Sequence, residues 1–190
     1  GISGKINAIG EASTKVGASI MPMSTGVIAM GTACVNTAND IDEAVNSYLT
    51  ATGTATSEAD KFKDVMNGIY SNNYGDSFED IADSMAKVKS NISDIDDSQL
   101  QEVTESALTL RDVFNYDVAE STRSVSTLME QFGITANEAY DLIAQGAQNG
   151  LDYSGELLDS IDEYSVQFAK VGMDAEDMFS IFANGAENGA

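Results

Sequence analysis

Hydrophobic residues recur at spacings of three and four positions along most of the chain, which is the pattern of one face of an amphipathic α-helix. The first stripe contains Ile41, Ala44, Val45, Tyr48 and Leu49. Short polar segments separate it from similar stripes within residues 62–70, 78–88, 100–114, 118–132 and 153–168. The pattern therefore predicts a series of helices joined by short connections.

Two polar segments in the second half carry helix-start signals. Thr135 is followed three residues later by Glu138, which is the spacing of a capping box, and Gly133 just before it suits the end of the preceding helix. Asp117 with Glu120 resembles a further N-cap. Connections of two to five residues in this half favour neighbouring antiparallel helices.

Three earlier polar segments are also predicted to separate helices. Thr56 or Ser57 is the expected N-cap of the helix that carries the stripe within residues 62–70. The Asn and Gly content of residues 71–77 predicts a turn. Ser98 with Gln101 is expected to form a capping box after an acidic break.

An internal repeat joins two segments near the end of the chain. FGITANEAYDLIAQGAQNG at 132–150 aligns with VGMDAEDMFSIFANGAENG at 171–189 at an offset of 39 residues. Each copy predicts a capped helix that ends in glycines, and in the first copy a second helix follows from about Tyr153. The equivalent of Tyr153 would fall at position 192, so we expect the sequence to be a piece of a longer protein. The predicted repeat and helix-end positions are Gly133, Gly146, Gly150, Gly172, Gly185 and Gly189.

The helix pattern and the repeat together predict an all-α fold. A repeated helix pair cannot bury its apolar face alone, so we expect short-loop antiparallel helices in a helical bundle or a small solenoid. Three regions are predicted: a Gly/Ala-rich apolar lead-in helix at 1–40, a helical hairpin region at 41–92, and a repeat-containing helical module at 93–190.

The lead-in contains VGASIMPMSTGVIAMGTACVNTAN at 16–39, twenty-four residues without a charge. This length matches a membrane span, but glycines, hydroxyl residues and Pro22 dilute it, and no secretory signal is convincing. Two interpretations stay open: a helix packed inside an assembly, or a segment that contacts a membrane transiently. The apolar positions that would carry either role are Val16, Ile20, Met21, Val27, Ile28 and Met30.

Charge narrows the classes of partner. The formal net charge is -22, with six lysines against eleven acids in residues 1–90 and three cations against twenty acids in residues 91–190. Such a charge works against binding to nucleic acid or to an anionic membrane surface. We therefore expect no direct nucleic-acid binding, and for the second half a basic or a neutral polar partner.

Candidate chemistry is sparse. Cys34 is the single cysteine and histidine is absent, which excludes an internal disulfide, the usual zinc sites and an imidazole base. We expect Cys34 to be a small buried hydrophobe. Asp94, Asp96 and Asp97 lack the glycine and the register of a calcium-binding loop, so we interpret them as a solvated acidic turn.

Two further candidates remain in the repeat region. Acidic side chains cluster on its predicted helices, and such clusters usually form a solvated face. The glycines of GAQNG end a helix and have no lysine nearby, unlike a phosphate-binding loop. We therefore predict no catalytic, cofactor-binding or metal-binding residue, no cofactor and no enzyme activity. The acids that an acidic enzyme would have to use are Asp159 with Asp162 or Glu163, and Glu176 with Asp177.

The stretch MEQFGITANEAYDLIAQGAQNGLDYSGELLDSIDEYSVQFAKVGMDAEDMFSIFANGAENGA at 129–190 resembles the conserved region of tail tape measure proteins from siphophages and prophages of Gram-positive bacteria. YGDSFEDIADSMAKV at 74–88 and IDEAVNSYLTATGTATSE at 41–58 are also similar to the core of that family. No catalytic motif belongs to this core.

The resemblance implies a structural role in virion assembly. Tape measure proteins lie in several copies, as homo-oligomers, inside the tail tube, and their length sets the number of tube rings. The implied partners are the major tail (tube) protein, the tail assembly chaperones and the distal tail protein. The implied locations are the host cytoplasm during assembly and then the virion, from which the protein is expelled ahead of the DNA. Because the loops here are short, we expect a compact module within the ruler.

An exported helical interaction or toxin-delivery protein of a Gram-positive bacterium is the alternative function. Long alanine-rich helical chains are also exported by such bacteria. A Trp-x-Gly signature between two helices would favour this alternative, and the chain has no tryptophan.

Overall fold

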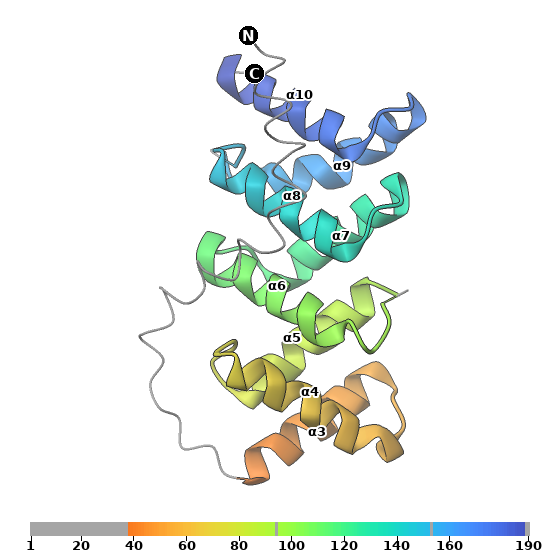
Figure 1. The fold of residues 1–190 in the computed structure, drawn as a ribbon, viewed down its shortest axis with the longest axis vertical. Coiled ribbons are helices and arrows are strands. Elements are labelled where there is room, and N and C mark those ends of the chain that lie inside the picture. The colour runs from red at the N-terminus through yellow and green to blue at the C-terminus, as the bar shows by residue number, and fades with distance from the viewer. Residues whose placement is uncertain (1–37, 94, 153, 189–190) are drawn as a thin grey trace. The chain divides into compact units, whose positions relative to one another are not determined.

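The computed structural model describes residues 38–188 except 94 and 153, and every regular element in this part of the chain is helical (Figure 1). The all-α prediction is confirmed. Most of the predicted lead-in, including Cys34 and the six apolar positions named above, lies outside the described residues. The helices are α3 (Ala38–Thr52), the 3-10 turn η2 (Thr56–Glu58), α4 (Ala59–Ser71), α5 (Phe78–Asn91), α6 (Leu100–Phe114), α7 (Val118–Phe132), α8 (Ala136–Gln148), α9 (Leu157–Lys170) and α10 (Ala175–Asn188).

The described residues divide into two compact units, 38–122 and 123–188, which we call the N-terminal and the C-terminal unit. In the N-terminal unit, α3 packs on α4 and α5, and both of these pack on α6. All five residues of the first predicted stripe are buried here, each no more than 5% exposed. The ring of Tyr48 lies 4.7 Å from that of Phe62, which joins α3 to α4. Burial of such side chains provides the main stabilisation of the unit.

The end of α5 is held to the start of α7 by the partly buried side-chain amide of Asn91. Asn91 Nδ2 donates to Thr122 Oγ1 at 2.8 Å and to the backbone oxygen of Ala119 at 3.2 Å. Thr122 is fully buried, and its hydroxyl also donates to the backbone oxygen of Val118 at 2.6 Å. A buried polar group costs free energy unless its hydrogen bonds are made, so these contacts fix the position of Asn91.

The C-terminal unit is built from the rest of α7 with α8, α9 and α10, and the last three helices pack against one another. Its core includes Tyr140 of α8, Ile161 of α9 and Met178 of α10, each at most 2% exposed. Ser124 of α7 donates to the backbone oxygen of Leu158 at 3.4 Å. The internal repeat and a solenoid arrangement remain predictions.

Both N-caps predicted in the second half are confirmed. Thr135 and Glu138 form a capping box, because the Thr135 side chain accepts from the Glu138 amide while Glu138 Oε2 accepts from the Thr135 amide at 2.8 Å. Asp117 Oδ1 accepts from the amides of Ala119 and Glu120 at 2.8 and 3.1 Å. These side chains satisfy backbone donors that have no partner inside the helix.

The predicted capping box at Ser98 is wrong. α6 begins at Leu100, and the amide of Ser98 donates to Asp96 Oδ1 at 2.9 Å. Gln101 does not reach back to Ser98, because its Nε2 donates to Glu105 one turn further on at 2.9 Å. The acidic break thus forms its own turn ahead of the helix.

Two other expected helix starts also need correction. Thr56 and Ser57 do not cap α4, because the 3-10 turn η2 contains both and α4 begins after it. The helix expected from about Tyr153 begins at Leu157, so the connection 149–156 is longer than predicted. Gly155 in this connection has a φ of +75°, and Asp152 Oδ1 accepts from the Leu157 amide at 3.0 Å. Because a right-handed helix needs a negative φ, α9 cannot include Gly155 and has to begin after it. Tyr153 itself lies outside the described residues.

Candidate functional site: surfaces that pack helices

Three of the predicted helix-end glycines lie within two residues of the end of a helix. Gly133, Gly150 and Gly172 come after α7, α8 and α9, with φ values of +69°, +80° and +80°. L-amino acids other than glycine adopt this left-handed region at a cost, so these positions favour glycine.

Gly146 has another environment. It is buried in the last turn of α8, where an added Cβ would lie 3.1 Å from the Phe179 ring and 3.3 Å from Leu157. The missing side chain thus allows α8 to approach both α9 and α10. Gly185 lies in the last turn of α10, and Gly189 lies outside the described residues.

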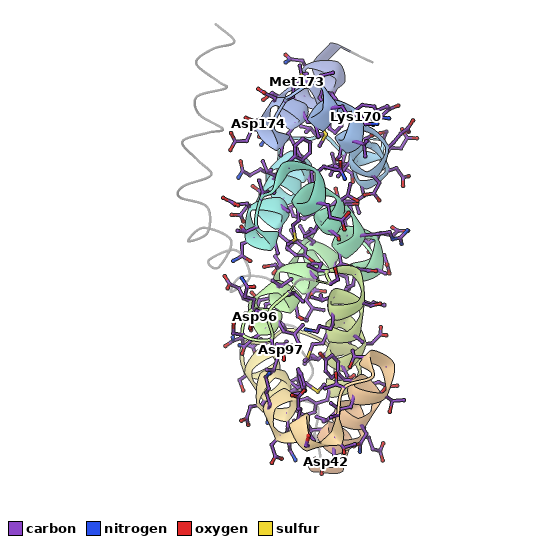
Figure 2. The ribbon with its side chains drawn as sticks, turned by 90° about the vertical axis from the view of Figure 1, so that its right-hand side faces the viewer. Asp42, Asp96, Asp97, Lys170, Met173 and Asp174 are labelled. Atoms are coloured by element: carbon purple, nitrogen blue, oxygen red, sulfur yellow. The ribbon has the colours of Figure 1, made fainter. Side chains whose placement is uncertain are left out.

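The acidic loop before α6 holds an ion-pair cluster. Asp97 Oδ2 lies 2.6 Å from Lys61 Nζ of α4, and its Oδ1 lies 2.8 Å from Lys89 Nζ of α5. Lys89 also donates to the backbone oxygen of Ile95 at 3.2 Å. Hydrogen bonds from Lys61 and then from Lys89 lower the pKa of Asp97. Figure 2 labels Asp97 beside Asp96 on this loop. Across the described residues, no group of three or more acidic, His or Cys side chains could hold a metal ion.

A second ion pair joins α5 to α6. Arg111 Nη1 lies 2.7 Å from Asp80 Oδ1, and its Nε donates to Asp112 at 2.8 Å. Asp80 Oδ2 accepts from the amide of Asp76 at 2.9 Å. Sequence reasoning missed both ion-pair clusters. The composition could have pointed to them. The chain has nine basic residues against thirty-one acids, so the few lysines and arginines were the candidates for ion pairs.

The acids that could have formed a catalytic pair are all exposed. Asp159, Asp162 and Glu163 lie on α9, while Glu176 and Asp177 lie in the first turn of α10. Desolvation is what commonly shifts the pKa of a carboxyl group toward the range useful for acid–base catalysis, whereas these side chains are in contact with solvent.

The two fully buried tyrosines belong to the core. Burial raises the pKa of Tyr48 to about 12, with a further contribution from the charge of Asp97. Burial also raises the pKa of Tyr140 above its usual value. Both phenols are therefore neutral at ordinary pH and contribute by packing.

An apolar surface remains exposed on the last two helices. Tyr164 of α9 and Ile181 of α10 are 42% and 43% exposed. Phe182 lies between the helices, with its ring 6.4 Å from that of Tyr164 and 5.9 Å from that of Phe168. We call Tyr164, Phe168, Ile181 and Phe182 the α9–α10 patch. The sequence pattern predicted Tyr164 and Phe168 as part of a stripe, and the structure places this end of the stripe at the surface.

In the described residues, Gly146, the ion pairs and the buried tyrosines lie where helices pack against one another. The class that the fold defines is therefore an all-α protein of short packed helices. None of the helices described is long and apolar enough to cross a membrane. The model of the family of phage-related minor tail proteins matches residues 70–190, which is more than half of the chain. The chain belongs to this family.

One curated relative is a probable tape measure protein of Streptomyces phage phiC31. It is 33% identical over 69 residues, which cover 36% of this chain and 10% of the phage protein. The chain thus matches about a tenth of the length of that relative. No solved structure matches the chain. The resemblance to tail tape measure proteins that the sequence predicted is confirmed.

Proposed function

We propose that the chain is part of a tape measure that sets the tail length of a phage or prophage, acts as a scaffold for assembly of the tail tube, and leaves the virion ahead of the DNA. The match of residues 70–190 to the minor tail protein family is the observation that supports this role most strongly. The similarity to a probable tape measure protein supports it further.

The proposed role is structural and not enzymatic. Membership of a family of tail proteins supports it, as do the exposed positions of the paired acids. The partners that we propose are the major tail protein around the tape measure, the tail assembly chaperones before the tube forms, the distal tail protein, and further copies of the chain. The division into lead-in, helical hairpin region and repeat-containing module belongs to the same proposal.

The proposal also specifies how the described residues contribute to the ruler, namely as compact modules of folded-back helices. A continuous helix adds about 1.5 Å of length per residue, whereas helices that fold back on one another add far less. In each unit, successive helices reverse direction at the connections between them (Figure 1). We propose that residues 38–188 form compact modules within the ruler, while other parts of the protein provide the extended length.

Particles of the phage that encodes the chain test the proposed location and exit. Trypsin cleaves after Arg123 and Lys170 and releases peptide 124–170, which quantitative mass spectrometry can follow. We expect this peptide in intact tails and its loss from tails that have ejected their DNA. The major tail protein is the control, because the tube stays behind. Peptide 124–170 at full amount in emptied tails, or missing from intact ones, would contradict the proposal.

A further inference from the structure

We propose that residues 38–188 are built from four two-helix repeats with a period of about 40 residues, and that the chain opens one repeat at a time. Repeats 1 to 4 are the pairs α3–α4, α5–α6, α7–α8 and α9–α10. Their first helices begin at residues 38, 78, 118 and 157, and their second helices begin at residues 59, 100, 136 and 175. The repeat that the sequence predicted covers only α8 and α10 of this series. The proposal concerns the fold and does not depend on the ruler function.

The first helices of the repeats bury equivalent positions. At intervals of 40 residues, four side chains are each at most 5% exposed: Ile41, Ile81, Ser121 and Ile161. Four positions further on, the side chains are at most 3% exposed: Val45, Met85, Val125 and Ser165. In the two middle repeats, each of the residues 81–90 is buried, half-buried or exposed just as its equivalent in 121–130 is. Because positions four apart share a face of a helix, the first helices pack by the same face.

The second helices also share a register. The fourth residue of each of them is at most 1% exposed, and these residues are Phe62, Val103, Ala139 and Met178. The buried position recurs, whereas the amino acid at that position does not. A packed core tolerates such exchanges as long as its total volume is kept. This tolerance explains why the repeat is visible in the amino-acid sequence only for α8 and α10.

Neighbouring repeats are joined by packing and by side-chain contacts. Equivalent helices of neighbouring repeats pack together in the pairs α3 with α5, α4 with α6, and α8 with α10. Three hydrogen bonds that join neighbouring repeats span 36, 31 and 34 positions, each less than one period: Lys61 to Asp97, Asn91 to Thr122, and Ser124 to Leu158. The stability of such an array is a sum of terms for each repeat and for each boundary. One repeat can therefore open while the others stay folded.

Two deletions test the period. Removal of residues 81–120 takes out one period, so the later residues keep their faces of the helix. Removal of residues 81–118 is the matched control: it turns the later residues by two positions, about 200°, and brings the charged Glu120 and Arg123 to buried places. Residues 38–71 pack against α5, and their amide hydrogen exchange is the measurement. We expect slow exchange after the one-period deletion and fast exchange in the control. Equal exchange of this segment in the two variants would overturn the proposal.

Pulling the full 190-residue chain from its two ends tests whether the repeats open singly. Each repeat that opens releases about 40 residues, which span roughly 140 Å when they are extended. With optical tweezers, we expect successive increases in contour length of about this size. A single increase for all of residues 38–188, or two increases that correspond to 38–122 and 123–188, would contradict the proposal.

A substitution at one boundary tests the place where two repeats meet. Asn91→Ala removes the hydrogen bonds that join the second repeat to the third. It should lower the force of one step and leave the length of every step unchanged. Thr127→Ala is the matched control, because the Thr127 hydroxyl donates within α7, to the backbone oxygen of Arg123 at 3.1 Å. If every step of the Asn91→Ala chain needs the same force as in the control, the proposed boundary is wrong.

Discussion

Asp97 brings three segments of the N-terminal unit together, since its carboxylate contacts a lysine of α4 and a lysine of α5 from the loop that precedes α6. Single surface ion pairs stabilise proteins little, because solvent and salt screen them. A carboxylate that two lysines share in a partly buried position is a stronger case, because several charges form a network there and solvent screens them less.

Asp97→Asn should lower the free energy of unfolding at neutral pH, and the effect should vanish in acid. The pKa of Asp97 is lowered in the folded protein. Its contribution is therefore fully present above the unfolded pKa of about 3.9 and is lost as the pH falls through the lower folded pKa. Urea unfolding of both proteins from pH 6 down to about pH 2.5 measures the difference.

Asp42→Asn is the control for this measurement. Among the described residues Asp42 pairs with the single lysine Lys63, and its side chain is 59% exposed against 28% for Asp97. Its removal should have the smaller effect. Equal effects of the two substitutions at pH 6, or a difference for Asp97→Asn that persists in acid, would show that the ion-pair cluster is not a stabilising element.

At the scale of the helix, the capping box at the N-terminus of α8 is the clearest local signal for a helix start. Thr135→Ala removes the side-chain oxygen that accepts from the Glu138 amide, and it should destabilise the C-terminal unit by about 1 kcal/mol. The pKa of Glu138 is lowered by hydrogen bonds from the backbone and then the side chain of Thr135. The substitution should therefore also raise that pKa, which NMR titration can follow.

Thr50→Ala provides the comparison within α3. Thr50 is exposed, and its hydroxyl donates to the backbone oxygen of Asn46 one turn earlier, which contributes little to helix stability. We expect a change in unfolding free energy of at most a few tenths of a kcal/mol. A Thr135→Ala variant as stable as Thr50→Ala would mean that the capping box does not set the start of α8.

The sequence predicted helix starts correctly where a side chain caps amides at a fixed spacing. It failed where two side chains could accept from the same amide, and where a contact joins residues far apart in the sequence. Asp117 and Thr135 stand at fixed spacing from the amides they cap, so the sequence identified both. Ser98 and Gln101 have the same spacing, but the backbone amide of Ser98 donates to Asp96 instead of to Gln101. No local pattern indicates that Lys61 reaches Asp97 across 36 positions, because such contacts arise only when the helices pack.

Within each unit, the fold is a set of short helices that pack by their apolar faces. The chain belongs to a family of phage-related minor tail proteins. The exposed α9–α10 patch was not predictable from periodicity alone. Hydrophobic spacing places Tyr164 and Phe168 on one face of a helix, but it does not show whether another element covers that face.

The central claim is that the chain forms compact, folded-back helices inside a phage tail, and zero-length crosslinking of intact particles tests it most directly. A carbodiimide joins an amine to a carboxylate only in direct contact. In a continuous helix, Lys61 and Asp97 would be about 54 Å apart, whereas here they lie 2.6 Å apart. We predict Lys61–Asp97 and Lys89–Asp97 crosslinks in peptides from intact tails. Tails that contain the chain but yield neither crosslink, while Lys87 still joins Asp83 within α5, would contradict the claim.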